Sequence, residues 1–358
     1  MPAVHSLTVT GYKSIRELRQ FGLTNLNVLI GANGAGKSNF ISLFRLLAEL
    51  ADEHLQIHVQ RQGGPDALLH FGRENTERLH AEFNFGVNSY KFALIPTGDN
   101  RLIFESEESG DTSGQYLFKN HLLGIGHDES KLRTATDACS AEVWSAVTNW
   151  RVYHFHDTGE HARVKRRHPG NDNLRLQTDA ANLAAYLHML HKDHLQHYQS
   201  IVQTIQLVAP YFRDFVLRPD AEFVELEWTQ SGKPDTVLKG NMLSDGTLRF
   251  ICLATLLLQP VHLLPDTVLI DEPELGLHPY AIAVLADLFK QVSENRQLII
   301  STQSVELVNE LNPEDVIVVD QEDDASIFRR CDKSALSGWL EEYAMGEIWK
   351  RNILGGRP

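Results

Sequence analysis

A short segment near the N-terminus constrains the fold more than any other. Residues 26–40 read LNVLIGANGAGKSNF, in which a β-type apolar run is followed by a glycine-rich turn and then by an amphipathic helical pattern. Glycines let a backbone wrap around a phosphate, and the N-terminus of the following helix adds positive charge. The pattern therefore predicts an α/β nucleotide domain whose phosphate-binding loop (P-loop) consists of Gly31, Ala32, Asn33, Gly34, Ala35, Gly36, Lys37, Ser38 and Asn39.

A second segment, 266–279, supplies the acids that such a site needs. It reads DTVLIDEPELGLHP, so Asp271 and Glu272 stand directly after an apolar strand. Two adjacent carboxylates at the end of a buried strand are costly unless they coordinate something. We expect Lys37 to reach the β- and γ-phosphates of ATP, Ser38 and Asp271 to hold Mg²⁺, and Glu272 to polarise the attacking water. The nucleotide domain must then be assembled from both ends of the chain.

A polar turn at Ser244–Thr247 raises a question of its own. The turn opens the apolar helical run 248–258, and a helix N-terminus with free N–H groups suits an anion. No neighbouring lysine in the sequence completes a phosphate cradle there. The pattern predicts an anion site but does not by itself identify the anion.

Several segments together resemble the ABC-type ATPases of the chromosome-maintenance, RecF and OLD group. The resemblance covers about half of the chain, at its two ends, and rests on GYKSI (11–15), GANGAGKSN (31–39), LSDGT (243–247), LIDEPELGLHP (269–279) and LIISTQS (298–304). It implies an ABC-ATPase-like P-loop fold, ATP and Mg²⁺ as cofactors, and a homodimer. In that family the signature turn, here Ser244–Thr247, caps the γ-phosphate held by a second subunit. Ser244 and Gly246 would make those contacts.

The chain departs from this family at two positions. The family's usual signature is LSGGQ, so Asp245 places an acid beside a phosphate, which is unfavourable unless the side chain points away. Gln303 stands where the family often has a histidine that senses the γ-phosphate. An amide can donate a hydrogen bond but cannot accept a proton, so Gln303 is predicted to be a switch and positioning residue. Glu272 is then the candidate base, and Gln62 is a guess for the glutamine that senses Mg²⁺.

Hydrophobic periodicity predicts how the domain is interrupted. We expect an antiparallel lobe at 81–118, a helical section at 134–150, a strand at 150–156, a helix at 180–208 and a strand at 222–229. From residue 267 strand and helix alternate, as a parallel core requires. The predicted division is residues 1–125 for the first half of the nucleotide domain with the β lobe, 126–235 for a mainly helical insertion, and 236–358 for the second half.

Amino-acid composition bears on the cellular compartment and on the partners that we expect for the protein. The 33 Lys and Arg residues against 47 Asp and Glu residues give a net charge of −14, which argues against a chain that coats DNA uniformly. The cysteines, Cys139, Cys252 and Cys331, show no CxxC spacing, which favours a reducing compartment. The N-terminus lacks a leader pattern, and no apolar run approaches the roughly 20 residues of a membrane span. We expect a cytoplasmic protein without a membrane partner.

Three further features invite functional interpretations. The segment 161–171, which we call the basic loop, could follow a nucleic-acid backbone or could simply be solvated; its cations are Arg163, Lys165, Arg166 and Arg167. A ladder of histidines at every third residue drifts around a helix and is a poor metal site; it comprises His188, His191, His194 and His197. Acids at 320–324 predict a hairpin, and we expect no nuclease within this chain.

Two classes of function remain open. The first is an ATP-driven dimerising switch that senses or grips nucleic acid and controls a separate effector, such as a nuclease or toxin, in phage defence or DNA repair. The second is the energy-coupling subunit of a transport or ribosome-associated complex. Transport subunits are usually shorter, are uninterrupted and keep the switch histidine, while translation factors carry two cassettes in one chain. The interruption and the single cassette favour the first class.

Overall fold

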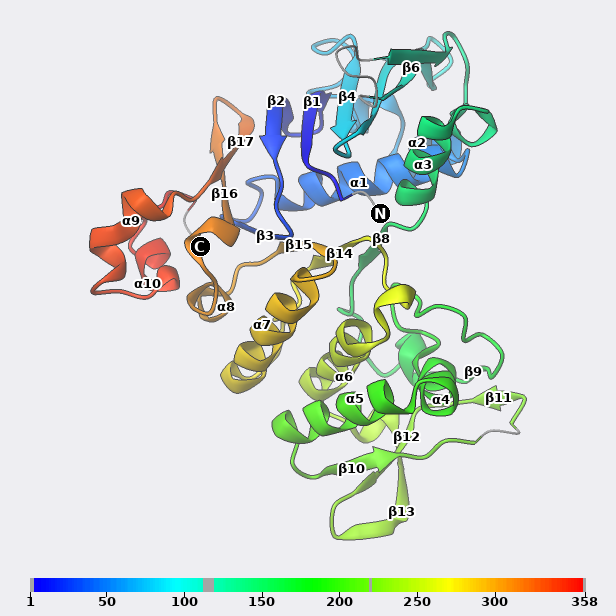
Figure 1. Ribbon diagram of the computed structural model, residues 1–358, viewed down its shortest axis with the longest axis vertical. Coiled ribbons are helices and arrows are strands. Elements are labelled where there is room, and N and C mark those ends of the chain that lie inside the picture. Colours follow the sequence, from blue (N-terminus) through cyan, green and yellow to red (C-terminus); the bar gives the residue numbers. More distant parts are fainter. Residues whose placement is uncertain (1–2, 112–118, 219–220, 357–358) are drawn as a thin grey trace.

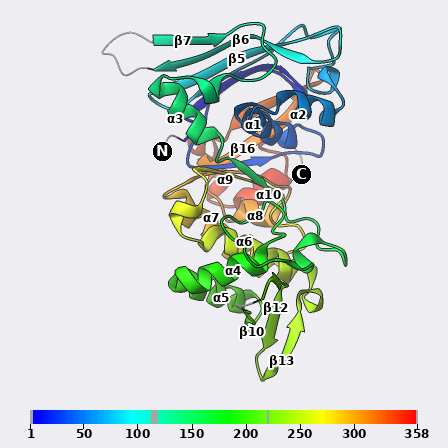
Figure 2. The ribbon, with the colours of Figure 1, turned by 90° about the vertical axis from the view of Figure 1, so that its right-hand side faces the viewer.

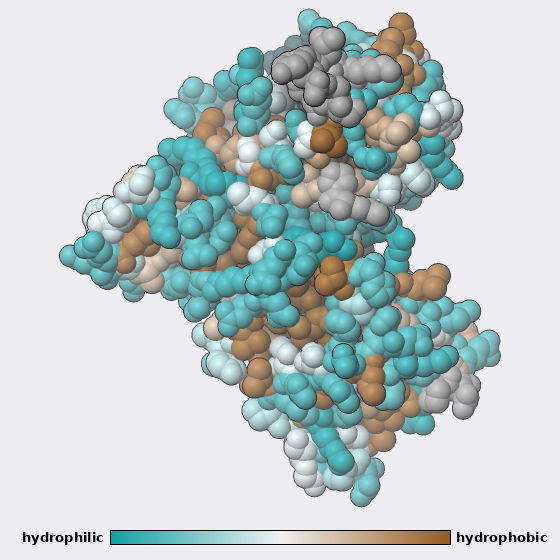
Figure 3. Space-filling view, in the orientation of Figure 1, coloured by the Kyte–Doolittle hydropathy of each residue, from teal (hydrophilic) through white to brown (hydrophobic). Residues whose placement is uncertain are grey.

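The structure is a computed structural model that describes residues 3–111, 119–218 and 221–356. Figures 1 and 2 show an antiparallel sheet at the top, a mainly parallel sheet in the middle and a helical lobe at the bottom. Hydrophilic side chains cover most of the face in Figure 3, and the apolar ones on it gather mainly between the upper part and the lower lobe. Within the described ranges, no helix is long and apolar enough to cross a membrane.

The upper sheet combines the predicted β lobe with two strands from the N-terminus. Its spatial order is β2 (Ile15–Gly22), β1 (Ser6–Tyr12), β4 (Leu79–Asn84), β5 (Asn88–Pro96), β6 (Leu102–Asp111) and β7 (Lys119–Gly124). Buried and less buried residues alternate along β4, as expected for a strand with one covered face. The antiparallel lobe expected at 81–118 is confirmed by β4, β5 and β6, and its last residues, 112–118, lie outside the described residues. The pairing of β1 with β4 was not predicted.

The central sheet contains the P-loop strand. Its spatial order is β17 (Ala325–Arg330), β16 (Val316–Glu322), β3 (Leu26–Ile30), β15 (Gln297–Ser301), β14 (Thr267–Asp271) and β8 (Arg151–Tyr153). All these strands are parallel except β17, which forms a hairpin with β16. Successive side chains enter different cores, since Leu29 joins the upper core while Val28 and Ile30 join the lower one. Burial on both faces explains the continuous apolar run in β3.

Helices separate the central sheet from its neighbours. Helix α1 (Lys37–Ala51) lies between the central and upper sheets, together with α2 (Leu55–Gln62) and α3 (Ala138–Val147) (Figure 2). The opposite face and the lower lobe contain α4 (Leu183–Asp193), α5 (Leu195–Val208), α6 (Asp245–Leu258) and α7 (Pro279–Ser293). The helix expected at 180–208 is divided at His194, whose backbone leaves the helical region at φ −139° and ψ 52°.

The remaining elements complete the lower lobe and the C-terminal segment. The lower lobe contains the sheet of β10 (Phe212–Phe215), β12 (Glu227–Gln230) and β13 (Lys233–Lys239), and the pair β9 (His168–Pro169) and β11 (Phe223–Val224). The C-terminal helices are α8 (Val305–Asn309), α9 (Lys333–Leu340) and α10 (Met345–Lys350). Residues 126–235 contribute α3 to the upper part, β8 to the central sheet and α4–α5 to the lower lobe. The domain division at 125 and 235 stays a prediction.

Candidate nucleotide-binding site

The candidate site lies at one edge of the central sheet. Because β3, β15, β14 and β8 are parallel neighbours, their carboxyl ends meet at this edge. Ligands of open α/β sheets bind at such an edge. The P-loop follows β3, the acids of 271–274 follow β14, and residues 302–304, which we call the switch segment, follow β15. The sequence motifs are thus brought together, although they are far apart along the chain.

Glycines of the P-loop are required by close approach as well as by backbone conformation. Gly31 and Gly36 have φ values of 153° and 114°, which a side chain rarely adopts. A Cβ added to Gly31 would collide with the carbonyl of Val319, and one added to Gly36 would collide with the hydroxyl of Ser326. The loop is therefore held against the β16–β17 hairpin, a contact that the motif alone does not reveal.

Lys37 is folded back onto its own loop. Its side chain is buried, and Nζ donates to the carbonyls of Gly31 at 2.6 Å and Ala32 at 3.0 Å. Burial lowers the pKa of Lys37, and the carboxylates of Glu272, Asp271 and Glu274 oppose that shift, so the ammonium group faces the acids after β14. Ser38, in contrast, is exposed at the start of α1.

Two serines outside the P-loop support it. Ser326 donates to the carbonyl of Ala35 at 2.6 Å and lies 2.7 Å from the hydroxyl of Ser14. Asn39 donates to the same Ser14 hydroxyl at 2.7 Å. Ser14 belongs to the GYKSI segment between β1 and β2, and Ser326 lies just after the β16–β17 turn. Our sequence analysis missed both roles, and only the GYKSI motif offered a signal for one of them.

Each acid after β14 has a partner on the neighbouring strand or in the switch segment. Ser301 donates to Asp271, and the side-chain amide of Gln303 donates to Glu272. Glu272 also has a left-handed backbone with φ 44°, a conformation that costs about 1–3 kcal/mol and is found at functional sites. Its N–H donates to the carbonyl of Ser301 at 3.0 Å. The candidate base and the candidate switch residue are thus held side by side.

Glu274 is a third acid at this edge, which we did not predict from the sequence. One oxygen, Oε1, accepts from the hydroxyl of Thr302 at 2.6 Å and from the N–H of Gln303 at 3.0 Å. The other, Oε2, is buried with no hydrogen-bond partner among the described residues. Burial raises the pKa of Glu274 above its usual value despite these two bonds. Glu274 therefore fixes the backbone of the switch segment.

The groups at this edge fit a magnesium nucleotide. The loop offers exposed Asn33, Gly34 and Ser38 at a helix N-terminus, and the lysine and the acids stand around it. A buried ammonium group among carboxylates suits an anion and its metal better than it suits an empty cleft. Lys37 and Ser38 are the candidate ligands for phosphate and Mg²⁺, with Asp271 as the second candidate metal ligand.

The signature turn lies on the lower lobe, at the N-terminus of α6. Ser244 caps the helix, because its hydroxyl accepts from the N–H of Thr247 at 3.2 Å. The Thr247 hydroxyl lies 2.8 Å from that of Ser244 and 3.0 Å from that of Tyr211. Across the described ranges, no hydrogen bond or ion pair joins this turn to the P-loop, which opens onto α1 in the upper part (Figure 1).

Helix α6 is tied to the segment after β14. Gly246 lies so close to the carbonyl of Gly276 that a Cβ would collide with it. Arg249 donates to the carbonyls of Leu275 at 2.6 Å and His156 at 2.9 Å. The ring of His156 in turn lies 2.9 Å from the carbonyl of Asp271, to which its Nε2 must donate. A direct chain of bonds therefore links Asp271, the candidate metal ligand, to the signature helix.

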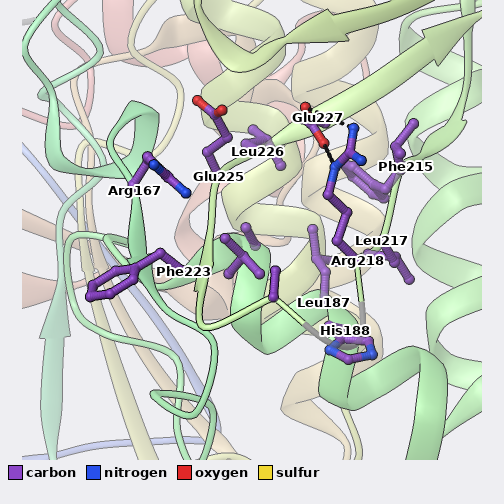
Figure 4. A pocket seen from close by; sticks show the side chains of 14 residues that line it. Arg167, Leu187, His188, Phe215, Leu217, Arg218, Phe223, Glu225, Leu226 and Glu227 are labelled. Atoms are coloured by element: carbon purple, nitrogen blue, oxygen red, sulfur yellow. Dashed lines mark hydrogen bonds and ion pairs between the residues drawn. The ribbon is translucent and has the colours of Figure 1, made fainter.

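The cations of the basic loop do not form one patch. Arg163 pairs with Asp179 at 2.7 Å on the surface, whereas the Lys165 side chain is only 8% exposed and lies 3.6 Å from Asp245. Arg166 donates to the carbonyl of His161 at 2.8 Å. Figure 4 shows Arg167 at one side of a pocket in the lower lobe, across from the Arg218–Glu227 ion pair. The cations of the basic loop therefore have different partners in different parts of the fold.

The other sequence features lie apart from the site. Gln62 ends α2 and accepts from the side chain of Lys13 at 3.3 Å, which gives no support to the guess that it senses Mg²⁺. The histidine ladder is divided between α4 and α5, and the described residues contain no group of three or more His, Cys, Asp and Glu side chains placed to hold a metal ion. The acidic hairpin is confirmed, with Asp323 and Asp324 in its turn at φ 47° and 61°. The three cysteines are free, and Cys139 and Cys252 are buried.

A sheet edge that gathers a P-loop and paired acids, with a signature turn on a separate lobe, is the organisation of an ABC-type P-loop ATPase. The comparisons with known proteins confirm this class, and with it the ATP hydrolase activity that we predicted. The chain belongs to the family described as "AAA domain, putative AbiEii toxin, Type IV TA system", whose model matches residues 26–309. None of the curated proteins matches the sequence.

Solved structures of Smc heads share the fold. One is an Smc head bound to the C-winged helix domain of ScpA, with 16% identity and a TM-score of 0.58, covering 93% of this chain and 99% of that one. Another is the Smc head domain with an extended coiled coil from Pyrococcus furiosus, bound to the C-terminal domain of ScpA. It has 14% identity and a TM-score of 0.58, covering 96% and 99%. The predicted α/β ABC-ATPase-like fold is therefore confirmed.

Proposed function

We propose that this ATPase is a switch that dimerises head to tail on ATP. The observation that supports this proposal is the signature turn, which offers a hydroxyl and a helix N-terminus, while no hydrogen bond or ion pair among the described residues joins it to the P-loop of its own chain. Exposed apolar side chains lie near it, with Met242 at 65%, Leu275 at 45% and Tyr280 at 52% exposure. Such side chains around an anion site suit a surface that a partner covers.

We call the edge of the central sheet that carries the P-loop, the acids of 271–274 and the switch segment the core edge. Its residues would have separate roles in hydrolysis. The bound magnesium nucleotide supplies the phosphoryl group and neutralises charge on the phosphates. Lys37 and Ser38 would hold it, and Asp271, oriented by Ser301, would be the second protein ligand of the metal. Glu272 takes the proton from the attacking water as general base, while Gln303 holds the carboxylate in place by its amide. Ser244 and Gly246 of a second copy close the site.

The dimer is the state that acts on other molecules. We propose that the two-subunit form senses or grips nucleic acid and controls a separate effector such as a nuclease or toxin, in phage defence or DNA repair. The family description, which names a toxin–antitoxin system, supports a role in defence. Because ATP favours the dimer only through contacts that the γ-phosphate makes, hydrolysis returns the switch to its resting state.

Sedimentation with ATP and with ADP tests the dimer. Wild type and Glu272→Gln should dimerise on ATP but not on ADP, and the variant dimer should persist because turnover is blocked. Ser244→Arg should still bind ATP as a monomer, yet lose both the dimer and turnover, because the bulky cation occupies the place of the partner's phosphate. Ser244→Arg protein that dimerises on ATP and turns over normally would exclude the proposed arrangement.

Within the basic loop, the structure reduces the number of cations that are candidates for contact with nucleic acid. Arg163 pairs with Asp179 and the Lys165 side chain is only 8% exposed, which leaves the exposed Arg166 and Arg167 as candidates. Changing both to Ala should weaken DNA or RNA binding and flatten its salt dependence by roughly one or two counterions. Arg163→Ala, which removes a paired cation from the same loop, is the matched control. Equal binding by all three proteins across a salt titration would remove nucleic acid from this loop.

A further inference from the structure

Lys165 lies beneath the signature turn rather than on the surface. It belongs to the 3₁₀ turn Arg163–Lys165 of the basic loop, and its side chain is only 8% exposed. Nζ donates to the carbonyl of Thr158 at 2.5 Å and lies 3.6 Å from Oδ1 of Asp245. We propose that Lys165 is a positioning residue of the ATPase, which neutralises Asp245 so that the turn can accept the γ-phosphate of a second subunit.

Asp245 creates the need for such a cation. It is the first residue of α6 and is 63% exposed, between Ser244 and Gly246, the two candidate phosphate contacts. An acid in the first turn suits the helix dipole when the helix stands alone. The same acid repels a phosphate, and the repulsion between two like charges is strong in a partly dry interface. A neutral turn requires a permanent counter-charge.

The position of Lys165 meets that need. A lysine is costly to bury unless it is paired and hydrogen-bonded, and here both the Asp245 carboxylate and the Thr158 carbonyl lie at its ammonium group. The chain reaches this place because the basic loop follows β8, whose carboxyl end lies at the same sheet edge as the P-loop. The signature turn therefore has a lysine after all, supplied by a distant part of the chain.

The neighbouring arginine shows that burial is not a general property of the loop. Arg163 stands two residues earlier and is 55% exposed, and it pairs with Asp179 on the surface. Loss of Arg163 removes the same charge from the same loop without touching the signature turn. Arg163→Met is therefore a matched control for Lys165→Met.

A charge swap separates neutralisation from simple structural support. Lys165→Met keeps the length of the buried stem and removes the charge, so it should lower turnover on the order of 100-fold and raise the ATP concentration needed for the dimer. Asp245→Asn should lower that ATP concentration, because the acid is gone while Lys165 remains. The double variant Lys165→Met/Asp245→Asn should recover turnover to within about tenfold of wild type.

ATP binding, melting temperature and turnover together distinguish neutralisation of Asp245 from a purely structural role of Lys165. Monomeric ATP binding should be unchanged in Lys165→Met, Asp245→Asn, the double variant and Arg163→Met, since the P-loop is untouched. Lys165→Met leaves the Thr158 carbonyl without its donor and should lower the melting temperature, and adding Asp245→Asn, which removes the unpaired acid, should restore part of that loss. A double variant no more active than Lys165→Met, or a Lys165→Met protein with normal turnover, would overturn the proposal, because the lysine would then serve only Thr158 or nothing. Loss of melting temperature in Lys165→Met that Asp245→Asn does not restore would likewise assign it a structural role.

The role of Lys165 rests on the proposed function, in which the signature turn contacts the γ-phosphate of a second subunit (the trans contact). Either proposal can fail without the other being tested by the same result. Normal turnover by Ser244→Arg would remove the trans contact whatever Lys165 does. An inactive Ser244→Arg protein together with a fully active Lys165→Met protein would remove only the role of Lys165. Measuring both variants in one series, with Arg163→Met alongside, decides which statement fails.

Discussion

The core edge and the signature turn differ in where their supporting residues come from. At the core edge, Asp271 is held by Ser301 of the adjacent strand, and Glu272 by Gln303 of the following segment. At the signature turn, the supporting groups come from the loop after β8, with Lys165 beside Asp245 and the His156 carbonyl beside Arg249. The carboxylates of the core edge are thus held by the adjacent strand and the segment that follows it, whereas the signature turn depends on a distant loop.

This difference bears on how the two regions are regulated. The strands that end at the core edge, β3, β14 and β15, are buried between two cores, so the sheet itself fixes where the residues after them begin. The signature turn is exposed and depends on a few polar bonds, which can be rearranged at little cost. We infer that the core edge sets the chemical step, whereas the lower lobe decides when a second subunit can complete the site.

The largest expected effect separates binding from chemistry at the core edge. Glu272→Gln should lower turnover by about 10²–10⁴-fold, because the water loses its general base while Lys37 and Ser38 still hold the phosphates. Lys37→Ala should instead weaken nucleotide binding by roughly 10–100-fold, since a charge-assisted contact is lost. Nucleotide titration and steady-state turnover of both variants check this. Normal turnover in Glu272→Gln would remove that residue as the base.

The core edge was predictable because its motifs are local. The glycines and Lys37 stand between one strand and one helix, and Asp271 ends a second strand, so the sequence pattern predicted the elements on which they lie. Ser326 and Glu274 were missed, because their roles depend on a hairpin and a switch segment that only the folded sheet brings close. In the same way, the basic loop suggested a surface patch, and only the position of β8 in the sheet shows that Lys165 faces Asp245.

An intermediate effect is expected where the two regions are joined. Arg249→Met removes the bonds from α6 to the carbonyls of Leu275 and His156, which should cost about 1–3 kcal/mol of stability. It should also weaken the ATP-dependent dimer while monomeric ATP binding stays normal. Denaturant unfolding and sedimentation measure the two effects. Arg218→Met, which removes a surface arginine paired with Glu227 in the same lobe, is the control, and its loss of stability should be smaller.

Equal unfolding curves for Arg249→Met and Arg218→Met would show that the core edge and the signature helix are not joined by these bonds. A loss of stability without any change in the ATP-dependent dimer would show that these bonds stabilise the fold but take no part in the switch. Only the combination of both losses supports the linkage from Asp271 through His156 and Arg249 to the signature turn.

The smallest effect concerns the buried acid of the core edge. Burial raises the pKa of Glu274 in the folded state, so the folded protein favours the protonated form more than the unfolded chain does. The resulting penalty is absent below the unfolded glutamate pKa of about 4.3, grows as the pH rises toward the folded pKa, and is constant above it. Glu274→Gln keeps an oxygen to accept from Thr302 and Gln303 but cannot ionise.

The melting temperature of Glu274→Gln relative to wild type should therefore rise with pH, by roughly 1–3 °C between acid and neutral conditions. The Oε2 position has no partner among the described residues, and an amide there remains unsatisfied, so only the pH dependence of the difference isolates the charge. Thermal melts of both proteins across this range measure it, with Glu306→Gln as the control, because Glu306 is an exposed acid that accepts from the Ser304 hydroxyl of the switch segment. A constant difference at all pH values would show that Glu274 is held as a carboxylate by its two bonds, and the core edge would then resemble the signature turn in relying on polar partners to keep a charge in place.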